Sequence, residues 1–460
     1  MLRPYQNQAI DEIRRLIYVD GQRNVLLHLA QGSGKTVIFC YILKAMYQNE
    51  KSAVMMVKGR QLVEQASWRL ARESVPHGVH MAGHYRYRPA EKIQVCSIDT
   101  LISRAQRPKA DLIIIDEAHM ATTKGYKSVL SNYDAPILHV TATPYNLAPM
   151  STVRPIDMQG LIDIGFLVPA RYFCPAIPNL KGVHTVGDDY NQQQLAKAID
   201  RGDLIADIVE TWKTHGQDRP SMAFAVNVLH SKHIAARFCD AGIPWKHCDA
   251  NTPDSERADI IEEHRLGKIK GISHVNIFST GVDIPWLSCL IMARPTKSKI
   301  LYHQQGGRGT RIAENKKDFL LLDHAGNVLR HGFLEEENGL VKTKANNTGE
   351  NVKGIRICSQ CFSAYRGTAC KACGNVGTVN TGIKKEKEGE LREIQETEEG
   401  KIYRKLRAVA AEKGYKRGWI FYRLAEKLGQ EAAEKMMPKR KIPRHIQVKL
   451  LEAQLEKFTH

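Results

Sequence analysis

The sequence predicts an α/β protein with two parallel sheets in tandem, followed by a small metal-binding module and a charged helical tail. Short apolar runs alternate with amphipathic stretches from residue 20 to about residue 145, and the same alternation restarts near residue 221. Continuous apolar strands of this kind are typical of parallel sheets that helices cover on both faces. After residue 335 the composition changes to a Gly-, Asn- and Lys-rich stretch, a cluster of cysteines and a highly charged segment.

Eight apolar runs are the candidate strands of these two sheets. They are Val25–Leu29, Ala53–Val57, Leu112–Ile115 and Ile137–Val140 in the first half, and Met222–Val226, Ile272–Val275, Leu290–Ala293 and Phe319–Leu322 in the second. We therefore expect one lobe at residues 1–160, a second at 161–335, a linker with a metal module at 336–383, and a helical tail at 384–460.

Charge and hydropathy narrow the classes of function. Lys and Arg number 67 against 49 Asp and Glu, a net charge of +18 that favours a polyanionic partner such as nucleic acid. No stretch approaches the roughly 18 consecutive apolar residues of a membrane span, and no N-terminal signal pattern is visible. We expect an intracellular protein that does not act at a membrane.

A glycine-rich loop follows the first apolar run. Residues 30–36 read Ala-Gln-Gly-Ser-Gly-Lys-Thr. Glycines allow a tight turn, so that the backbone N–H groups of Gly32, Ser33 and Gly34 can face phosphate oxygens. In such a loop Lys35 would reach the β- and γ-phosphates, and the Thr36 hydroxyl would ligate Mg²⁺.

An acidic pair ends the third apolar run, where the chain reads Asp116-Glu117-Ala118-His119. An acid at the carboxyl end of a parallel strand lies at the sheet edge that also carries the phosphate loop. There Asp116 would hold Mg²⁺, and Glu117 would orient and deprotonate the attacking water. His119 fits two roles, a phosphate sensor or a packed histidine.

Two arginines in the second half complete the constellation. Residues 304–311 read Gln-Gln-Gly-Gly-Arg-Gly-Thr-Arg. Arg308 and Arg311 are three residues apart, a spacing that would place them on one face of a helix. Entering the nucleotide cleft from the opposite lobe, they would stabilise charge on the γ-phosphate only when the lobes close. A surface pair of arginines beside glycine-rich loops is the alternative.

Taken together, these motifs resemble those of superfamily 2 helicases of the DEAD/DEAH type, which have two RecA-like lobes, over roughly residues 1–330. The first residues, Leu2–Gln6, resemble the glutamine motif of that superfamily. The sequence departs from the motifs of that superfamily at two positions. Leu29 stands where the phosphate-loop pattern has Gly, and Gln31 stands where relatives usually carry Thr. Neither departure removes a phosphate or metal ligand, so we expect activity to remain.

The resemblance implies roles for further residues. It implies nucleotide contacts from Gln6, Gly281 and Asp283, nucleic-acid contacts from Arg60, Gln65, Thr100 and Thr280, and coupling of hydrolysis to lobe movement through His119, Thr141, Thr143 and Gln304. Gln6 also fits a solvated residue at a helix start, Asp283 also fits a turn carboxylate, and the two threonines also fit caps of a turn. Asp323–Asn327 and the later cysteines look most like RadD-type bacterial DNA-repair helicases and their phage relatives, which implies the cytoplasm of a bacterium or of a phage-infected cell.

The cysteine cluster reads Cys358-x₂-Cys361-x₈-Cys370-x₂-Cys373. Two CxxC pairs offer four thiolates, which can surround one Zn²⁺ tetrahedrally in a small structural ribbon. Redox pairs or free thiols are the alternatives. Beyond the cluster, residues 401–449 carry fifteen Lys and Arg against four acidic residues, interleaved with aromatics. This pattern fits nucleic-acid contacts or a packed helical pair equally.

The sequence therefore predicts an ATP-dependent helicase or translocase with ATP, Mg²⁺ and Zn²⁺ as cofactors. Nucleic acid is the expected partner, and the resemblance to DNA-repair helicases implies DNA in preference to RNA, in repair, recombination or replication. The alternatives are an RNA helicase, and a nucleic-acid-stimulated ATPase or ATP-gated clamp that separates no strands. The tail is the expected place for a protein partner, and oligomeric state is not predicted.

Overall fold

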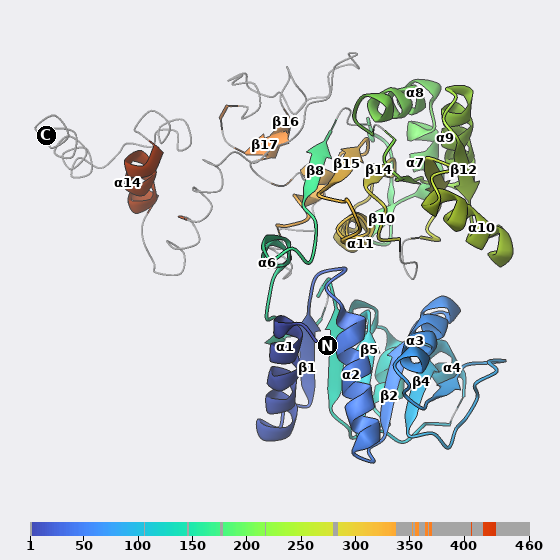
Figure 1. Cartoon of the computed structure of the whole chain (residues 1–460), viewed down its shortest axis with the longest axis vertical. Coiled ribbons are helices and arrows are strands. Elements are labelled where there is room, and N and C mark those ends of the chain that lie inside the picture. Colours follow the sequence, from blue (N-terminus) through green and yellow to red (C-terminus); the bar gives the residue numbers. More distant parts are fainter. Residues whose placement is uncertain are drawn as a thin grey trace, which may run out of the picture.

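Two parallel sheets, each flanked by helices, form two stacked lobes (Figure 1). The computed structural model describes residues 2–104, 106–144, 147–174, 178–216, 218–278 and 284–336, and beyond them residues 352, 355–357, 364–366, 368–369, 406 and 417–428. The lobes have parallel-sheet α/β architecture, as tandem RecA-like domains do. Among the described residues, no helix combines the length and the apolar character needed to cross a membrane.

The first lobe contains a seven-stranded sheet in the order β3-β4-β2-β5-β6-β1-β7, with every neighbouring pair parallel. Its strands are β1 (Asn24–His28), β2 (Ala53–Val57), β3 (Gly78–His80), β4 (Ile93–Ser97), β5 (Leu112–Asp116), β6 (Ile137–Thr141) and β7 (Ser151–Val153). All five residues of β2 and of β4 are buried, because helices cover both faces of the sheet.

Two hydrophobic clusters divide the helices of this lobe between the faces of the sheet. One face carries α1 (Pro4–Arg14), its π-helical continuation η1 (Arg15–Val19), α2 (Lys35–Gln48) and α3 (Arg60–Arg72), and the other carries α4 (Ile98–Ser103), the 3-10 turn η2 (Ala118–Met120) and α5 (Lys124–Leu130). Because all strands run parallel, their carboxyl ends meet at one edge, from which the phosphate loop and the acidic pair both emerge.

The second lobe contains a six-stranded parallel sheet in the order β12-β13-β11-β14-β15-β8. Its strands are β8 (Ala170–Phe173), β11 (Ser221–Phe224), β12 (Trp245–Cys248), β13 (Gly271–His274), β14 (Cys289–Met292) and β15 (Phe319–Asp323). Its helices are α6 (Met158–Asp163), α7 (Gln192–Ile199), α8 (Gly202–Thr211), η3 (Trp212–Gly216), α9 (Val228–Asp240), α10 (Asp254–Arg265), α11 (Lys299–Gly306) and α12 (Asn327–His331). A short hairpin, β9 (Thr185–Val186) and β10 (Asp189–Tyr190), precedes α7.

The lobes share part of their hydrophobic core. Tyr5 of α1 and Ala30 of the glycine-rich loop belong to the same buried cluster as residues of α6, β8 and α11. The Tyr5 ring lies 5.9 Å from Phe166, and the Arg3 guanidinium lies 3.9 Å from the centroid of that same phenyl ring. Side chains thus join the start of the first lobe to the start of the second.

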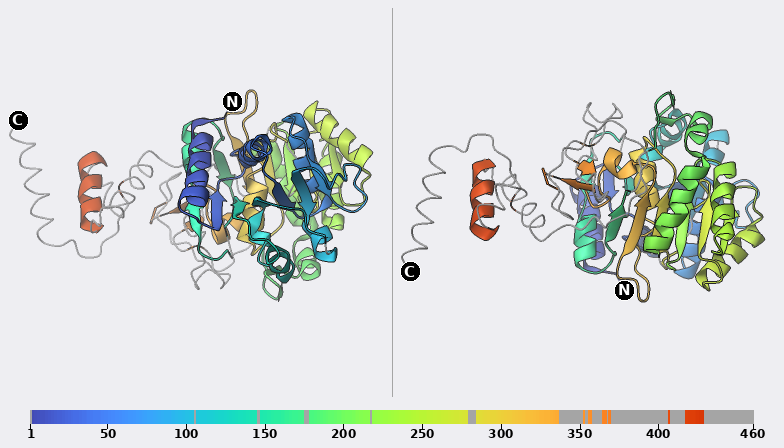
Figure 2. Two further views of the ribbon diagram at one scale, coloured as in Figure 1. Left: turned by 90° about the horizontal axis from the view of Figure 1, so that it is seen from below. Right: turned by 90° about the horizontal axis from the view of Figure 1, so that it is seen from above.

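Three elements are described beyond residue 352. A two-stranded antiparallel ribbon consists of β16 (Ile355–Ile357) and β17 (Ala364–Arg366), and α14 (Arg417–Leu428) lies apart from both lobes in every view (Figures 1 and 2). The predicted zinc ligands Cys358, Cys361, Cys370 and Cys373 lie outside the described residues. In the sequence, the first CxxC pair falls between β16 and β17.

Candidate active site

The phosphate loop follows β1 and leads directly into α2, whose first residue is Lys35. Gly34 has φ +84°, and a Cβ there would come within 2.6 Å of the Gln6 side-chain nitrogen, so glycine is required on both counts. The Lys35 ammonium donates hydrogen bonds to the carbonyl oxygens of Leu29 and Ala30, both at 3.0 Å. Thr36 lies exposed in the first turn of α2. The loop therefore presents a lysine and a hydroxyl together at the start of a helix.

The acidic pair stands at the carboxyl end of β5, as predicted from the sequence. Asp116 Oδ1 accepts a hydrogen bond from the Glu117 backbone N–H at 3.0 Å. Glu117 has a left-handed backbone with φ +51°, a conformation that costs free energy in a residue with a side chain and is concentrated at functional sites. Burial raises the pKa of both carboxyls, and the nearby Lys35 ammonium opposes that rise.

Several buried oxygens around the loop have no hydrogen-bond partner among the described residues. They are Ser33 Oγ, Glu117 Oε2 and Thr143 Oγ1. Unsatisfied buried oxygens are costly, and they are what a site for a hydrated magnesium nucleotide would contain. Asp116 and Thr36 supply the oxygen ligands that Mg²⁺ prefers. The residues present therefore fit a bound triphosphate with its metal ion.

A hydrogen bond links the acidic motif to the end of β6. His119 Nδ1 lies 3.1 Å from Thr141 Oγ1, which in turn accepts the Thr143 backbone N–H at 3.0 Å. Burial and the nearby Lys35 charge lower the pKa of His119 to about 4, so the imidazole is neutral at neutral pH. His119 Nδ1 also lies 3.4 Å from Glu117 Oε2. The histidine is packed, and it is also placed between the acid pair and the two threonines.

The arginines of the second lobe face this site across the lobe boundary. A Cβ on Gly307 would lie 2.6 Å from Gln31 Cβ, and a Cβ on Gly32 would lie 3.4 Å from Arg311 Cγ. Burial is the main cause of the raised pKa of Glu117 and of the lowered pKa of Lys35; the Arg308 charge opposes the first shift, and the Arg311 charge adds to the second. Arg308 thus acts electrostatically on the acid pair, and Arg311 acts on the phosphate loop.

The expectation that the two arginines share a helix face is wrong. Helix α11 ends at Gly306, and Arg308 lies in the turns that follow, while Arg311 forms an isolated antiparallel bridge with Leu167. The glycine-rich segment favours turns over a helix, and a Cβ on Gly309 would lie 2.2 Å from the Phe319 ring. The arginines are therefore positioned by packing of a loop against β15. Gln304 is buried on α11.

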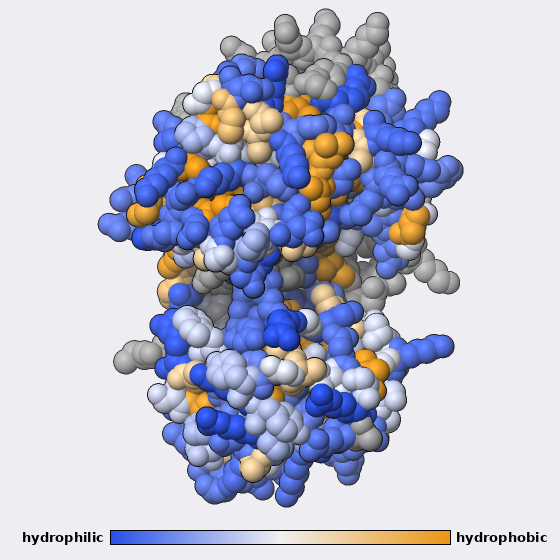
Figure 3. Space-filling model, turned by 90° about the vertical axis from the view of Figure 1, so that its right-hand side faces the viewer, coloured by the Kyte–Doolittle hydropathy of each residue, from blue (hydrophilic) through white to orange (hydrophobic). Residues whose placement is uncertain are grey.

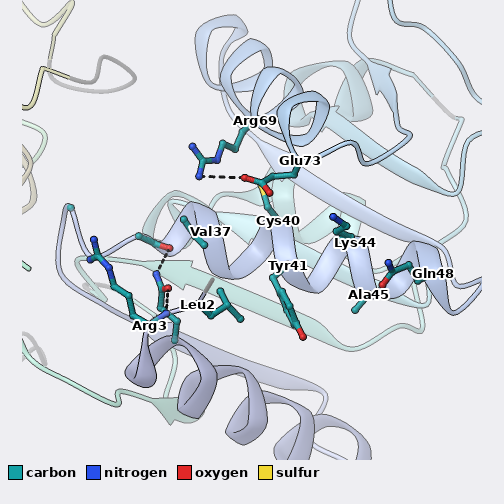
Figure 4. Close-up of a pocket in the computed structure, with 13 residues that line it drawn as sticks. Leu2, Arg3, Val37, Cys40, Tyr41, Lys44, Ala45, Gln48, Arg69 and Glu73 are labelled. Atoms are coloured by element: carbon teal, nitrogen blue, oxygen red, sulfur yellow. Dashed lines mark hydrogen bonds and ion pairs between the residues drawn. The ribbon is translucent and has the colours of Figure 1, made fainter.

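A pocket of about 640 Å³ opens beside Gln6, between the start of α1 and the length of α2 (Figure 4). Gln6 Oε1 accepts the Arg3 backbone N–H at 2.9 Å, and its amide nitrogen lies 3.5 Å from the Gly34 carbonyl oxygen. Figure 4 shows Tyr41 and Lys44 of α2 along the pocket, with the ion pair between Arg69 of α3 and Glu73, the residue that follows α3, at its far side. Its size suits a small ligand.

The predicted nucleic-acid residues of the first lobe lie on the helices that follow the neighbouring strands β2 and β4. Arg60 and Gln65 are exposed on α3, but Thr100 is buried on α4 with 7% of its surface exposed. Thr280, Gly281 and Asp283 lie outside the described residues. Sequence reasoning did not single out Tyr5 for the site, although its hydroxyl donates to the Ser33 carbonyl at 2.5 Å and so ties α1 to the phosphate loop. An aromatic residue directly before Gln6 was the available signal.

Two family models match the chain. The model described as the res subunit of type III restriction enzymes matches residues 1–146, and the model described as the helicase conserved C-terminal domain matches residues 205–313. The first match contains the phosphate loop, the acid pair and the Thr141–Thr143 segment. The second contains both arginines.

The alignments with individual relatives cover most of this chain, but they cover different fractions of the relatives' own lengths. A 51.5 kDa protein of a Lactococcus phage is 26% identical over 362 residues, covering 75% of this chain and 76% of the relative. The Saccharomyces cerevisiae protein IRC3, to which ATP-dependent helicase activity is ascribed, is 28% identical over 356 residues, covering 71% of this chain and 52% of its own length.

Among solved structures, the type ISP restriction-modification enzyme LlaBIII bound to DNA has a similar fold. The TM-score is 0.54 at 18% identity, and the match covers 71% of this chain and 28% of that enzyme.

Proposed function

This chain belongs to superfamily 2 of the helicases, in the DEAD/DEAH-type group of nucleic-acid-dependent ATPases, and on that premise we propose that it is an ATP-driven helicase or translocase acting on DNA. The observation that carries the proposal is the meeting of two half-sites. Lys35 and the acid pair come from one lobe, and Arg308 and Arg311 act on them from the other. Hydrolysis that requires both lobes couples chemistry to lobe closure.

The residues suggest how the reaction proceeds. Lys35 and the loop amides bind the triphosphate, and Thr36 and Asp116 would hold Mg²⁺, which neutralises phosphate charge when bound. Glu117 orients the attacking water and accepts its proton on a carboxylate whose pKa burial raises, which makes it a stronger base than an exposed carboxylate. Arg308 and Arg311 stabilise charge on the γ-phosphate. The pocket beside Gln6 accommodates the base of the nucleotide.

Two features support DNA as the partner in preference to RNA. A restriction-enzyme family model matches the first lobe, and the structurally similar LlaBIII is described as bound to DNA. The net charge of +18 suits either nucleic acid. We also propose a role in repair, recombination or replication.

The test is ATP hydrolysis measured across single-stranded DNA, duplex DNA, forked DNA and RNA at one stated salt concentration, because phosphate contacts weaken steeply with salt. We expect a low rate without nucleic acid and a clear rise with DNA. Stimulation by RNA alone would replace the DNA assignment with an RNA helicase. Hydrolysis that no nucleic acid accelerates would overturn the proposed function, and binding of ATP without any phosphate release would indicate a clamp.

For the cysteine cluster we propose a structural zinc site formed by Cys358, Cys361, Cys370 and Cys373. The donor set supports it, since two CxxC pairs supply four thiolates to one tetrahedral ion. We expect about one zinc per chain by elemental analysis of the purified full-length protein, and loss of that zinc in Cys358→Ser with Cys361→Ser. Cys239→Ser, at an exposed cysteine of the second lobe, is the matched control and should keep its zinc. Equal zinc content in all three proteins would contradict the site.

A further inference from the structure

We propose that the loop joining β3 to β4, residues 81–92, is a stacking platform on which the unpaired bases of a single nucleic-acid strand lie against Tyr85. The proposal rests on the proposed function and adds a specific contact to it. Tyr85 is 79% exposed and Tyr87 43% exposed, in a segment that reads His84-Tyr85-Arg86-Tyr87-Arg88. Exposed aromatic rings interleaved with arginines suit base stacking combined with phosphate contacts.

Two neighbours contact the Tyr85 ring. It stacks on the imidazole of His84, with ring centroids 4.7 Å apart and planes inclined by 24°, and the Arg86 guanidinium lies 5.4 Å from its centroid. His84 is buried, whereas most of the Tyr85 side chain is exposed to solvent. A ring already oriented by its neighbours loses little conformational freedom when a base stacks on it.

Hydrogen bonds fix the support under the ring. His84 Nδ1 accepts the Arg86 backbone N–H at 3.0 Å, so the proton is on Nε2, which donates to Glu64 Oε2 at 3.0 Å. The Val79 backbone N–H donates to the Arg86 carbonyl at 2.9 Å, which ties the loop to β3. The platform therefore stands on a defined backbone anchored to β3 and α3.

The second ring connects the loop to the segment after α4. Tyr87 packs edge-on against His80, with centroids 5.5 Å apart, and its hydroxyl donates to Gln106 Oε1 at 3.3 Å. His80 is 1% exposed, and burial lowers its pKa, so it stays neutral and serves as an apolar support. Arg104 and Arg107 stand close enough to contribute to that lowering.

Cations surround both rings. Arg60, a predicted nucleic-acid residue, reaches the platform itself, since its guanidinium lies 3.5 Å from the Ala82 carbonyl oxygen. The cations that follow the carboxyl ends of the neighbouring strands β2, β3 and β4 are Lys58, Arg60, Arg86, Arg104 and Arg107, against the acidic Glu64 and Asp99. Arg88 and Glu91 lie toward the amino ends of β3 and β4, since their carbonyl oxygens accept from the Gln94 amide. The side of the first lobe with α3 and α4 is mostly hydrophilic in Figure 3. A strand crossing this edge therefore meets cations near Tyr85 that can contact its phosphates.

The experiment compares Tyr85→Ala and Tyr85→Trp with the full-length wild type. Affinity is measured by fluorescence anisotropy on a labelled oligo-dT, and stacking by quenching of 2-aminopurine placed in a single strand. We expect about ten-fold weaker binding and reduced quenching for Tyr85→Ala, and near wild-type behaviour for Tyr85→Trp, which keeps a stacking face. Tyr18→Ala is the matched control, since Tyr18 is 61% exposed in η1, which precedes β1 and so lies toward the opposite edge of the sheet.

Failure of the platform and failure of the proposed function give different results. If wild-type ATPase rises with DNA but Tyr85→Ala binds the oligonucleotide as wild type does, the platform is wrong and the proposed function stands. An equal loss of affinity for blunt duplex DNA would overturn the single-strand assignment. The basal ATPase rate and the melting temperature of Tyr85→Ala should match those of the wild type. If Tyr85→Ala and Tyr85→Trp both melt at a lower temperature than the wild type, the loss of binding would be assigned to impaired folding.

Discussion

Replacing Lys35 by alanine is expected to abolish ATP hydrolysis, to below about a thousandth of the wild-type rate, with or without nucleic acid. Its ammonium lies inside the phosphate loop, 3.0 Å from two loop carbonyls, and its charge opposes the rise in pKa of both acidic carboxyls. Alanine removes the charge that would contact the β- and γ-phosphates. It also removes the positive charge that opposes the rise in pKa of Asp116 and Glu117.

The measurement is steady-state phosphate release at saturating ATP and saturating single-stranded DNA. Lys51→Ala is the matched control, because Lys51 is an exposed lysine just beyond the carboxyl end of α2, and it should hydrolyse ATP at the wild-type rate. If hydrolysis persists undiminished in Lys35→Ala, the assignment of the phosphate loop is wrong.

The eight apolar runs predicted from the sequence all form strands, within one or two residues of the expected bounds. They are central strands of covered parallel sheets, where burial on both faces requires continuous apolar residues. Strand β4 was not predicted although all of its residues are buried, because Gln94 interrupts its run of apolar residues. The Gln94 amide is satisfied by the carbonyl oxygens of Arg88 and Glu91, at 2.8 and 2.9 Å, and a linear reading does not contain those partners.

Strands at the sheet edges were missed for a different reason. β12 ends one sheet, and its central residues Lys246 and His247 are only partly buried. β3 and β7 end the other sheet and are three residues long. Edge strands pair on one side only, so they tolerate polar and short sequences that carry little periodic signal.

The candidate site divides in the same way between local and long-range information. The phosphate loop and the acid pair are local patterns at strand ends, and the sequence was sufficient to place them at one edge of one sheet. The contact of Gly307 with Gln31, and of Arg3 and Tyr5 with Phe166, joins segments more than 160 residues apart in sequence. Such contacts depend on how two independently formed lobes pack, which no periodicity encodes.

Replacement of Arg308 is expected to have the second large effect, and it distinguishes a role in catalysis from a role in ATP binding. Arg308→Ala is expected to lower kcat by about 10³-fold or more while ATP is still bound, because the guanidinium comes from the opposite lobe and stabilises charge that develops during phosphoryl transfer. Arg308 is 7% exposed, and its charge acts on Glu117 across the lobe boundary. Arg308→Lys restores the charge but lacks the planar guanidinium that can donate two parallel hydrogen bonds, so it should recover only part of the rate.

The two readouts are single-turnover hydrolysis with saturating single-stranded DNA and equilibrium binding of a non-hydrolysable ATP analogue. Arg265→Ala, an exposed arginine paired with Glu262 at the end of α10, is the control and should match wild type in both. An interaction made only in the transition state lowers kcat and leaves the dissociation constant unchanged. Weaker analogue binding with an unchanged rate of hydrolysis once ATP is bound would instead assign Arg308 to ground-state binding, and lobe closure would then no longer be the step that completes the catalytic site.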